Sequence, residues 1–305
     1  MLYTANVDAI AAVSLKKATA LKHSLTGFLT LSVLAGFYVG FGVILAMICA
    51  APVAALNPGI GKIIAGATFG IALSLVIVAG CELFTGYNLL IMKGGFRGTV
   101  TIGDAMLGWF WTYLGNLGGS MIFGLMIIMT GIFAADPWRT FLLNVATYKC
   151  NAPWWELFFR GIFCNWLVCL AIWSSFRCGG NNSATLIMIW WCLFAFITTG
   201  MEHSIANMTI LTIANLLPGA APAVTWGKMF GWNLVPVTLG NIVGGTFFVT
   251  FLYWFATYMD ERGARKLEAL RAAGVTDETR GYRVPSGELK QEEIKDVRVK
   301  MKEKE

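Results

Sequence analysis

The sequence predicts an all-α membrane protein with six transmembrane helices. The first observation behind this prediction is the composition: of 305 residues, 57% are hydrophobic and 13% are charged, whereas about 25% of the residues of a soluble domain are charged. The second is the spacing of the charges, because four long stretches contain no Asp, Glu, Lys or Arg: residues 23–61, 105–135, 203–227 and 229–259. A helix needs about 20 mainly apolar residues to cross a bilayer, and each stretch is longer than that.

Six apolar segments divide the chain, at about 25–50, 63–92, 103–134, 153–176, 184–217 and 231–258. Several of them exceed the length of one crossing, which indicates tilted, re-entrant or interfacial stretches. Together they predict a transmembrane domain over residues 25–258.

Two segments of different character flank this domain. Residues 1–24 place one aspartate and three lysines among apolar residues, a pattern that predicts an amphipathic helix at the membrane interface. Residues 259–305 carry 12 Lys and Arg and 11 Asp and Glu. A charged segment with so little apolar surface to bury is expected to be poorly ordered, and we interpret it as a cytoplasmic tail.

The distribution of basic residues predicts the orientation of the chain. With both termini on one side, the loops of that side hold ten Lys and Arg and the opposite loops hold five. Because cytoplasmic loops are enriched in Lys and Arg, we expect both termini in the cytoplasm and a multi-pass protein of the inner (plasma) membrane. The net charge of +6 does not indicate nucleic-acid binding, because the basic excess lies in loops between apolar segments.

A faint internal repeat relates the first three segments to the last three. The second segment places Glu82 among small polar residues, and the fifth does the same with Glu202. The third and sixth segments share the triplet Leu-Gly-Asn, at 114–116 and 239–241. Because three is odd, two such halves must lie in opposite orientation across the membrane. Inverted repeats of this kind place a solute site near the midplane, between two interrupted helices.

Three ionisable residues lie within apolar segments: Glu82, Glu202 and His203. Such residues are costly in a membrane and usually serve a function. We interpret the two glutamates as structural, accepting hydrogen bonds from backbone N–H groups that a broken helix leaves free. His203 is the functional candidate, because histidine can change its charge near neutral pH.

Three motifs, in the same order along the chain, carry a resemblance to a known family. Residues 201–208, Met-Glu-His-Ser-Ile-Ala-Asn-Met, are similar to the signature of the formate/nitrite transporter family. Residues 81–86, Cys-Glu-Leu-Phe-Thr-Gly, and residues 164–171, Cys-Asn-Trp-Leu-Val-Cys-Leu-Ala, resemble two further motifs of that family. The resemblance covers about residues 15–258.

The residues around 158–161 and 189–192 look closest to the nitrite branch of the family. The resemblance therefore implies passage of nitrite, with formate and hydrosulfide as alternatives within the family, and with protons as a second transported species. It implies a transport protein rather than an enzyme, without a cofactor or a metal.

The resemblance also implies a fold and a set of pore residues. The fold is an aquaporin-like protomer with helices 2 and 5 broken, assembled as a homopentamer with one pore in each protomer. The central histidine would be His203, facing Thr85, with Asn165 and Asn207 nearby and Lys149 in the outer vestibule. The apolar constrictions would be formed by Phe69, Phe84 and Val168 on the outer side and by Leu73 and Phe196 on the inner side.

A hypothesis for the mechanism follows from the cost of dehydrating an anion. An isolated charge in an apolar constriction is strongly destabilised, so the constrictions favour a neutral species. Lys149 and Arg160 would concentrate anions at the outer mouth. His203, held by Thr85 and Asn165, would then donate a hydrogen bond or a proton, and the neutral weak acid would cross.

Three alternatives belong to other classes. A haem-bearing subunit needs transmembrane histidines as axial ligands, and the chain has only His23, at the edge of a segment, and His203. A facilitator of neutral solutes such as water or glycerol would use a similar fold, but the outer basic residues and the buried histidine argue against it. A structural scaffold would not need polar residues inside its spans.

Overall fold

The computed structural model describes residues 3–218 and 222–272, and every regular element among them is a helix, which confirms the all-α class. The described residues divide into two units, Tyr3–Thr257 and a second that begins at Tyr258. Within the described residues, five helical stretches are long and apolar enough to cross a membrane: Leu25–Ala54, Pro58–Gly80, Ile102–Thr130, Trp154–Arg177 and Lys228–Ala269. Two shorter apolar helices, Asn182–Thr198 and Ser204–Leu216, lie on either side of a break.

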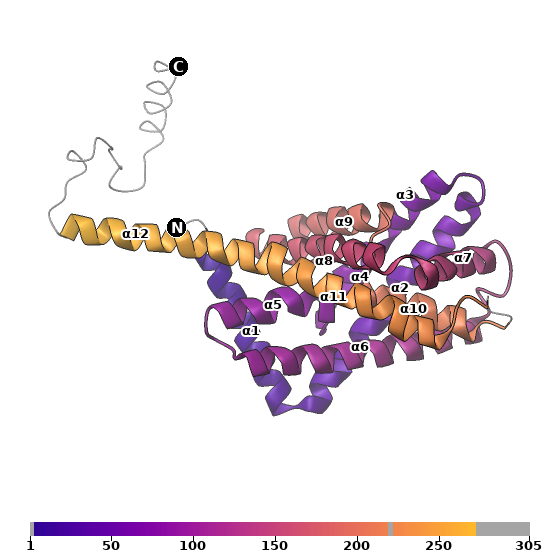
Figure 1. Ribbon diagram of the computed structural model, residues 1–305, viewed down its shortest axis with the longest axis horizontal. Helices are drawn as coiled ribbons and strands as arrows, with labels where there is room; N and C mark the ends of the chain where they lie inside the picture. Colours follow the sequence, from indigo (N-terminus) through magenta and orange to yellow (C-terminus); the bar gives the residue numbers. More distant parts are fainter. Residues whose placement is uncertain (1–2, 219–221, 273–305) are drawn as a thin grey trace, which may run out of the picture. The chain divides into compact units, whose positions relative to one another are not determined.

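The first half of the chain runs in the order α1 (Thr4–His23), α2 (Leu25–Ala54), α3 (Pro58–Phe69), α4 (Ile71–Leu75), η1 (Val76–Gly80), α5 (Phe84–Phe96) and α6 (Ile102–Thr130). The second half continues with α7 (Trp138–Asn151), α8 (Trp154–Arg177), α9 (Asn182–Thr198), α10 (Ser204–Leu216), η2 (Lys228–Leu234), α11 (Val235–Val243), η3 (Gly244–Phe251) and α12 (Leu252–Ala272) (Figure 1). The η elements are π-helical stretches, so the last apolar segment is one continuous helix from Lys228 onward.

The two segments that were predicted to flank the transmembrane domain correspond in part to helices α1 and α12. A helix runs over Thr4–His23, buries one side and packs on α5, while the amphipathic helix at a membrane interface that the sequence suggests over residues 1–24 stays a prediction. The expected charged tail begins in α12, which continues as a helix to Ala272. Residues 273–305, for which poor order was predicted, lie outside the described residues.

Local signals set where the helices begin. The Asn57 side chain caps α3 by accepting hydrogen bonds from the Gly59 and Ile60 amides at 3.0 and 3.2 Å, and Pro58 occupies the first position, where its missing N–H is not needed. At α6, Thr101 and Asp104 form a reciprocal capping box. The Asn57 cap, followed by Pro58, explains why α3 begins five residues before the predicted segment at 63.

Small residues allow two pairs of long helices to pack closely in equivalent ways. A Cβ atom on Gly119 of α6 would lie 2.2 Å from the Val33 carbonyl oxygen of α2. A Cβ atom on Gly244 would lie at the same 2.2 Å from the Ile162 carbonyl oxygen of α8. Only glycine permits such backbone contact, and close approach of this kind is how membrane helices gain packing energy.

The two predicted helix breaks are present. Gly80 and Gly200 adopt left-handed backbone conformations, with φ of 79° and 75°, which glycine reaches without steric cost. The amide of the next residue donates a hydrogen bond back to a carbonyl of the preceding helix. Cys81 donates to Val76 at 3.1 Å, and Met201 donates to Phe196 at 2.9 Å. A short extended stretch follows each glycine, and α5 and α10 then begin.

Candidate functional site

The first break is held by one asparagine. Asn116 on α6 donates from Nδ2 to the Glu82 carbonyl at 2.8 Å and to the Ser32 carbonyl at 2.7 Å, and its Oδ1 accepts from the Phe84 amide at 2.9 Å. The side chain is fully buried. It therefore satisfies a carbonyl within the break and the first amide of α5, and ties both to α2.

The second break is held in the same way by Asn241. Its Nδ2 donates to the Glu202 carbonyl at 2.9 Å and to the Gly161 carbonyl at 2.8 Å, and its Oδ1 accepts from the Ser204 amide at 2.9 Å. These are the asparagines of the repeated Leu-Gly-Asn triplets. Sequence reasoning used the triplet only as a sign of the repeat, and assigned no role to either side chain.

Each break also carries a glutamate that is paired with a lysine. Lys17 Nζ of α1 lies 2.5 Å from Glu82 Oε2. Lys149 Nζ of α7 lies 2.8 and 2.9 Å from the two carboxylate oxygens of Glu202. We expected both carboxylates to accept from freed backbone N–H groups, and this interpretation is corrected here: asparagine oxygens take those amides at Phe84 and Ser204, and the glutamates bind ammonium groups.

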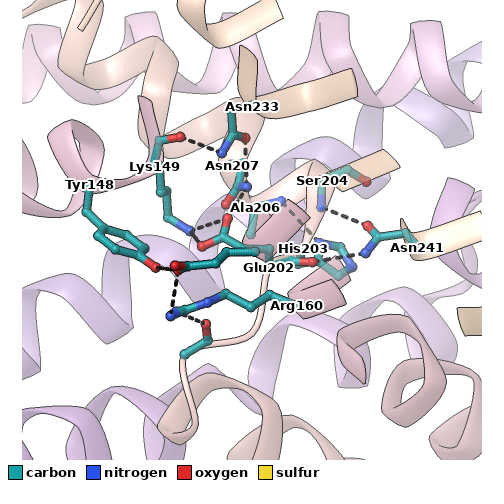
Figure 2. A network of polar contacts seen from close by, with 12 residues as sticks. Tyr148, Lys149, Arg160, Glu202, His203, Ser204, Ala206, Asn207, Asn233 and Asn241 are labelled. Atoms are coloured by element: carbon teal, nitrogen blue, oxygen red, sulfur yellow. Dashed lines mark hydrogen bonds and ion pairs between the residues drawn. The ribbon is translucent and has the colours of Figure 1, made fainter. Parts of the chain in front are cut away.

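A closed ring of polar side chains surrounds the second pair (Figure 2). Asn207 Nδ2 donates to Glu202 Oε2 at 2.6 Å and to Asn233 Oδ1 at 2.9 Å, and Asn233 Nδ2 donates to the Lys149 carbonyl at 2.9 Å. The side chains of Lys149 and Glu202 are only 10% and 3% exposed. The predicted vestibule lysine is therefore a buried member of a neutral pair. Sequence reasoning missed Asn233, although an amide inside a charge-free stretch was a signal for it.

His203 sits at the start of α10, and its two ring nitrogens have different partners. Nδ1 accepts a hydrogen bond from the Ala206 amide at 3.1 Å, and Nε2 lies 3.0 Å from the Thr85 hydroxyl. Because an amide can only donate, Nδ1 carries no proton in this arrangement, and the neutral ring holds its proton on Nε2. Nε2–H therefore donates to Thr85 Oγ1, which leaves the threonine hydroxyl proton free for another acceptor.

Asn165 completes the group on the side of Thr85. Its Nδ2 donates to the Thr85 carbonyl at 3.2 Å and to the Asn241 carbonyl at 2.7 Å. Its Oδ1 is buried and has no hydrogen-bond partner among the described residues. Asn207 lies in α10, one helical turn after His203, which caps that helix. The structure thus brings together four residues that the sequence suggested for the pore: Thr85, Asn165, His203 and Asn207.

A cavity of about 590 Å³ leads to this group from the side of Lys149. Its walls are mainly apolar and include Val43, Met47, Phe69, Val145, Ile197 and Ile210. Four charged side chains also line it: Lys62, Lys149, Arg160 and Glu202. His203 lines the cavity as well, so a solute in the cavity can reach the histidine.

Arg160 is held at the wall of this cavity by two contacts. Its guanidinium lies 3.5 Å from Glu156 and donates to the Gly200 carbonyl at 3.1 Å. Tyr148 donates to the same glutamate at 3.3 Å. Burial raises the pKa of the Tyr148 phenol, so this side chain remains a neutral donor at physiological pH.

The five predicted constriction residues are all buried. The Phe69 and Phe196 rings meet edge to face at 5.8 Å, and Phe196 stacks on His203 at 6.0 Å. These two phenylalanines were assigned to different constrictions, yet they form one contact. Phe84 packs against Tyr113 of α6 at 5.0 Å, and Leu73 and Val168 are each 2% exposed. The division into outer and inner constrictions stays a prediction.

Among the described residues there is no group of three His, Cys, Asp or Glu that could hold a metal ion.

Comparison with known proteins agrees with this architecture. The family model described as formate/nitrite transporter matches residues 5–255. The nitrite transporter NirC of Salmonella typhimurium is 40% identical over 263 residues, covering 86% of this chain and 95% of its own. The formate channel FocA of Escherichia coli is 30% identical over 252 residues, covering 77% of this chain and 87% of its own.

Solved structures give the same result. A structure described as an FNT family ion channel has a TM-score of 0.78 at 40% identity, covering 83% of this chain and 99% of its own. A pentameric formate channel with formate bound has a TM-score of 0.69 at 27% identity, with 78% and 99% covered. The resemblance noted in the sequence is thereby confirmed, and the chain belongs to the formate/nitrite transporter family.

Proposed function

We propose that this protein, an anion channel or transporter by family, carries nitrite across the inner (plasma) membrane. The similarity to nitrite transporters at about 40% identity supports nitrite, and the excess of basic residues in one set of loops supports cytoplasmic termini. The similarity to a pentameric formate channel supports a homopentamer with one pore in each protomer. The proposal involves no enzymatic step and no cofactor.

One observation carries the proposal: the hydrogen bond between Thr85 and His203, which joins the two helix breaks beside an apolar cavity. The donor is His203, the residue that caps α10, and the acceptor is Thr85 of α5, at 3.0 Å. A solute that reaches this point has left bulk water, because the cavity walls are apolar. Beyond the charged side chains of the cavity wall, it meets the Thr85–His203 pair here, where two half-helices begin and their N-terminal ends add partial positive charge.

The chemistry of the site favours a weak acid in its neutral form. A bare anion loses its hydration in the apolar walls at a large cost, whereas the protonated acid loses little. His203 Nε2–H or the Thr85 hydroxyl can donate to a bound oxygen. Protonating His203 fully would require Nδ1 to give up the Ala206 amide, so the geometry favours hydrogen-bond donation over a permanent imidazolium. The proton that neutralises the anion then enters together with the solute.

A transport assay with purified protein in liposomes tests this proposal. We expect rapid uptake of nitrite, with formate and hydrosulfide crossing as well, because one apolar slit rejects close analogues poorly. We expect uptake to rise as the external pH falls, since the neutral acid becomes more abundant. Glycerol permeability should equal that of empty liposomes. Correctly folded protein that admits glycerol but none of the three anions would contradict the proposal and favour a neutral-solute facilitator.

Thr85→Val should reduce nitrite uptake about tenfold, since one hydrogen bond of about 1.4 kcal/mol corresponds to a factor of ten. Valine keeps the shape of threonine but cannot accept from His203 or donate to a solute. Thr85→Ser retains the hydroxyl and should transport at close to the wild-type rate. Equal uptake by the valine and serine variants, at matched protein content, would remove Thr85 from the pathway.

A further inference from the structure

Three of the four charged side chains that line the cavity already have partners of opposite or complementary charge. Lys149 and Glu202 form a buried pair at 2.8 Å, and such a pair contributes little net charge to its surroundings. Arg160 faces Glu156 at 3.5 Å and also donates to the Gly200 carbonyl. The basic residues that were expected to attract anions are therefore largely compensated.

Lys62 differs from these residues. It lies in the second turn of α3, is exposed and lines the cavity. Within the described residues it has neither an ion pair nor a hydrogen bond. Its neighbours in the cavity wall include Ala54 and Pro58, which border an exposed turn between α2 and α3. Because Lys62 is itself exposed, we take this end of the cavity as its mouth.

The position of Lys62 along α3 relates the mouth to the deeper site. Phe69 lies seven residues further along the same helix, a rise of about 10 Å. Phe69 contacts Phe196, and Phe196 stacks on His203. An anion held near Lys62 therefore lies in the same cavity as His203, about two turns of α3 before the Phe69 and Phe196 rings that adjoin the histidine.

We propose that Lys62 captures the incoming anion at the mouth of the cavity, ahead of the His203 site; this inference rests on the proposed function. Among the described residues of the wall, its charge is the one without a partner, and apolar walls of low dielectric constant focus the field of such a charge into the cavity. Lys62 raises the local anion concentration and hence the rate of encounter. It takes no part in the step at His203.

This role predicts a specific kinetic signature. Lys62→Gln should lower the initial rate of nitrite uptake by about three- to tenfold at low ionic strength, where electrostatic steering acts at long range. The maximal rate at saturating nitrite should be unchanged, because the His203 site is intact. At an ionic strength of about 1 M the Debye length is about 3 Å, and the difference from wild type should disappear.

The experiment compares four proteins in liposomes, with sodium gluconate as a bulky electrolyte to set the ionic strength. They are wild type, Lys62→Gln, Lys62→Arg and the matched control Lys228→Gln. Lys62→Arg keeps the positive charge and should transport like wild type. Lys228 is a half-buried lysine that donates to Asn151 Oδ1 at the end of α7 and does not line the cavity. Its replacement removes the same charge and should change the rate at most slightly.

The outcomes separate the two claims. A defect in Lys62→Gln that salt abolishes and that Lys62→Arg and Lys228→Gln lack supports capture by Lys62. A rate unchanged in Lys62→Gln at low ionic strength, or an equal loss in Lys228→Gln, overturns this role while leaving nitrite transport by the wild type intact. Wild-type protein that carries no anion overturns the proposed function itself, and the role of Lys62 with it.

Discussion

Lys149→Met should destabilise the protein by about 3–5 kcal/mol, because removing one partner of a buried ion pair leaves the other charge uncompensated. Methionine fills the space of the lysine stem but cannot bind Glu202, which is 2% exposed. For a chain of this size each kcal/mol lowers the melting temperature by about 2–4 °C. The expected shift is therefore on the order of 10 °C, measured by thermal unfolding in detergent.

The double variant Lys149→Met/Glu202→Gln provides the control for this result. A neutral glutamine keeps the shape of Glu202 and can still accept from Asn207, so no buried charge remains. We expect the double variant to recover most of the lost melting temperature, since a buried ion pair as a whole contributes little to stability. A double variant as unstable as the single variant would show that the loss comes from packing rather than from the unpaired carboxylate.

Asn241→Leu should lower the free energy of unfolding by at least about 3 kcal/mol. Leucine has a similar volume, but it leaves the Ser204 amide and the Glu202 and Gly161 carbonyls without the partners they have at 2.8–2.9 Å. Each buried backbone group left unpaired costs about 1–3 kcal/mol. The corresponding fall in melting temperature is about 6–12 °C.

Two further variants complete this test. Asn116→Leu removes the same three bonds at the first break and should cause a comparable loss. Asn215→Leu removes a single side-chain bond within α10, at 2.8 Å to the Leu211 carbonyl, and should change the stability by no more than about 0.5 kcal/mol. If Asn241→Leu melts at the temperature of Asn215→Leu, the asparagines do not hold the breaks.

Much of the fold could be predicted because apolar length and charge depend only on composition. The predicted segments at 25–50 and 103–134 correspond to Leu25–Ala54 and Ile102–Thr130. The fifth segment was predicted as one span with a polar interruption, and the structure divides it into α9 and α10 around Glu202 and His203. The boundaries of the predicted segments were less accurate. A cap such as Asn57 starts its helix ahead of the apolar residues, and hydropathy alone does not reveal this.

The partners within the site were less accessible from the sequence. Lys17 and Glu82 are 65 residues apart, and Lys149 and Glu202 are 53 apart; no local pattern links them. Lys17 was interpreted only as a residue of the interfacial helix. Lys149 was expected to act as a free charge, because the sequence gives no sign that α7 would bring it to Glu202. Only the fold decides which charges remain uncompensated.

The two bonds of His203 can be separated by substitution, and this gives the most direct test of the whole account. Asparagine is a preferred helix N-cap, so His203→Asn should still accept from the Ala206 amide and preserve α10. Its shorter side chain lacks the ring nitrogen that reaches Thr85. His203→Ala, in contrast, removes the cap and the Thr85 contact together.

The measurement is nitrite uptake into liposomes by wild type and His203→Asn, at equal protein content and with a melting temperature close to that of the wild type. We expect at least about a tenfold lower rate for His203→Asn, the equivalent of one lost hydrogen bond to the solute, together with an altered pH dependence. A folded His203→Asn variant that takes up nitrite at the wild-type rate and with the wild-type pH profile would contradict a pathway centred on His203.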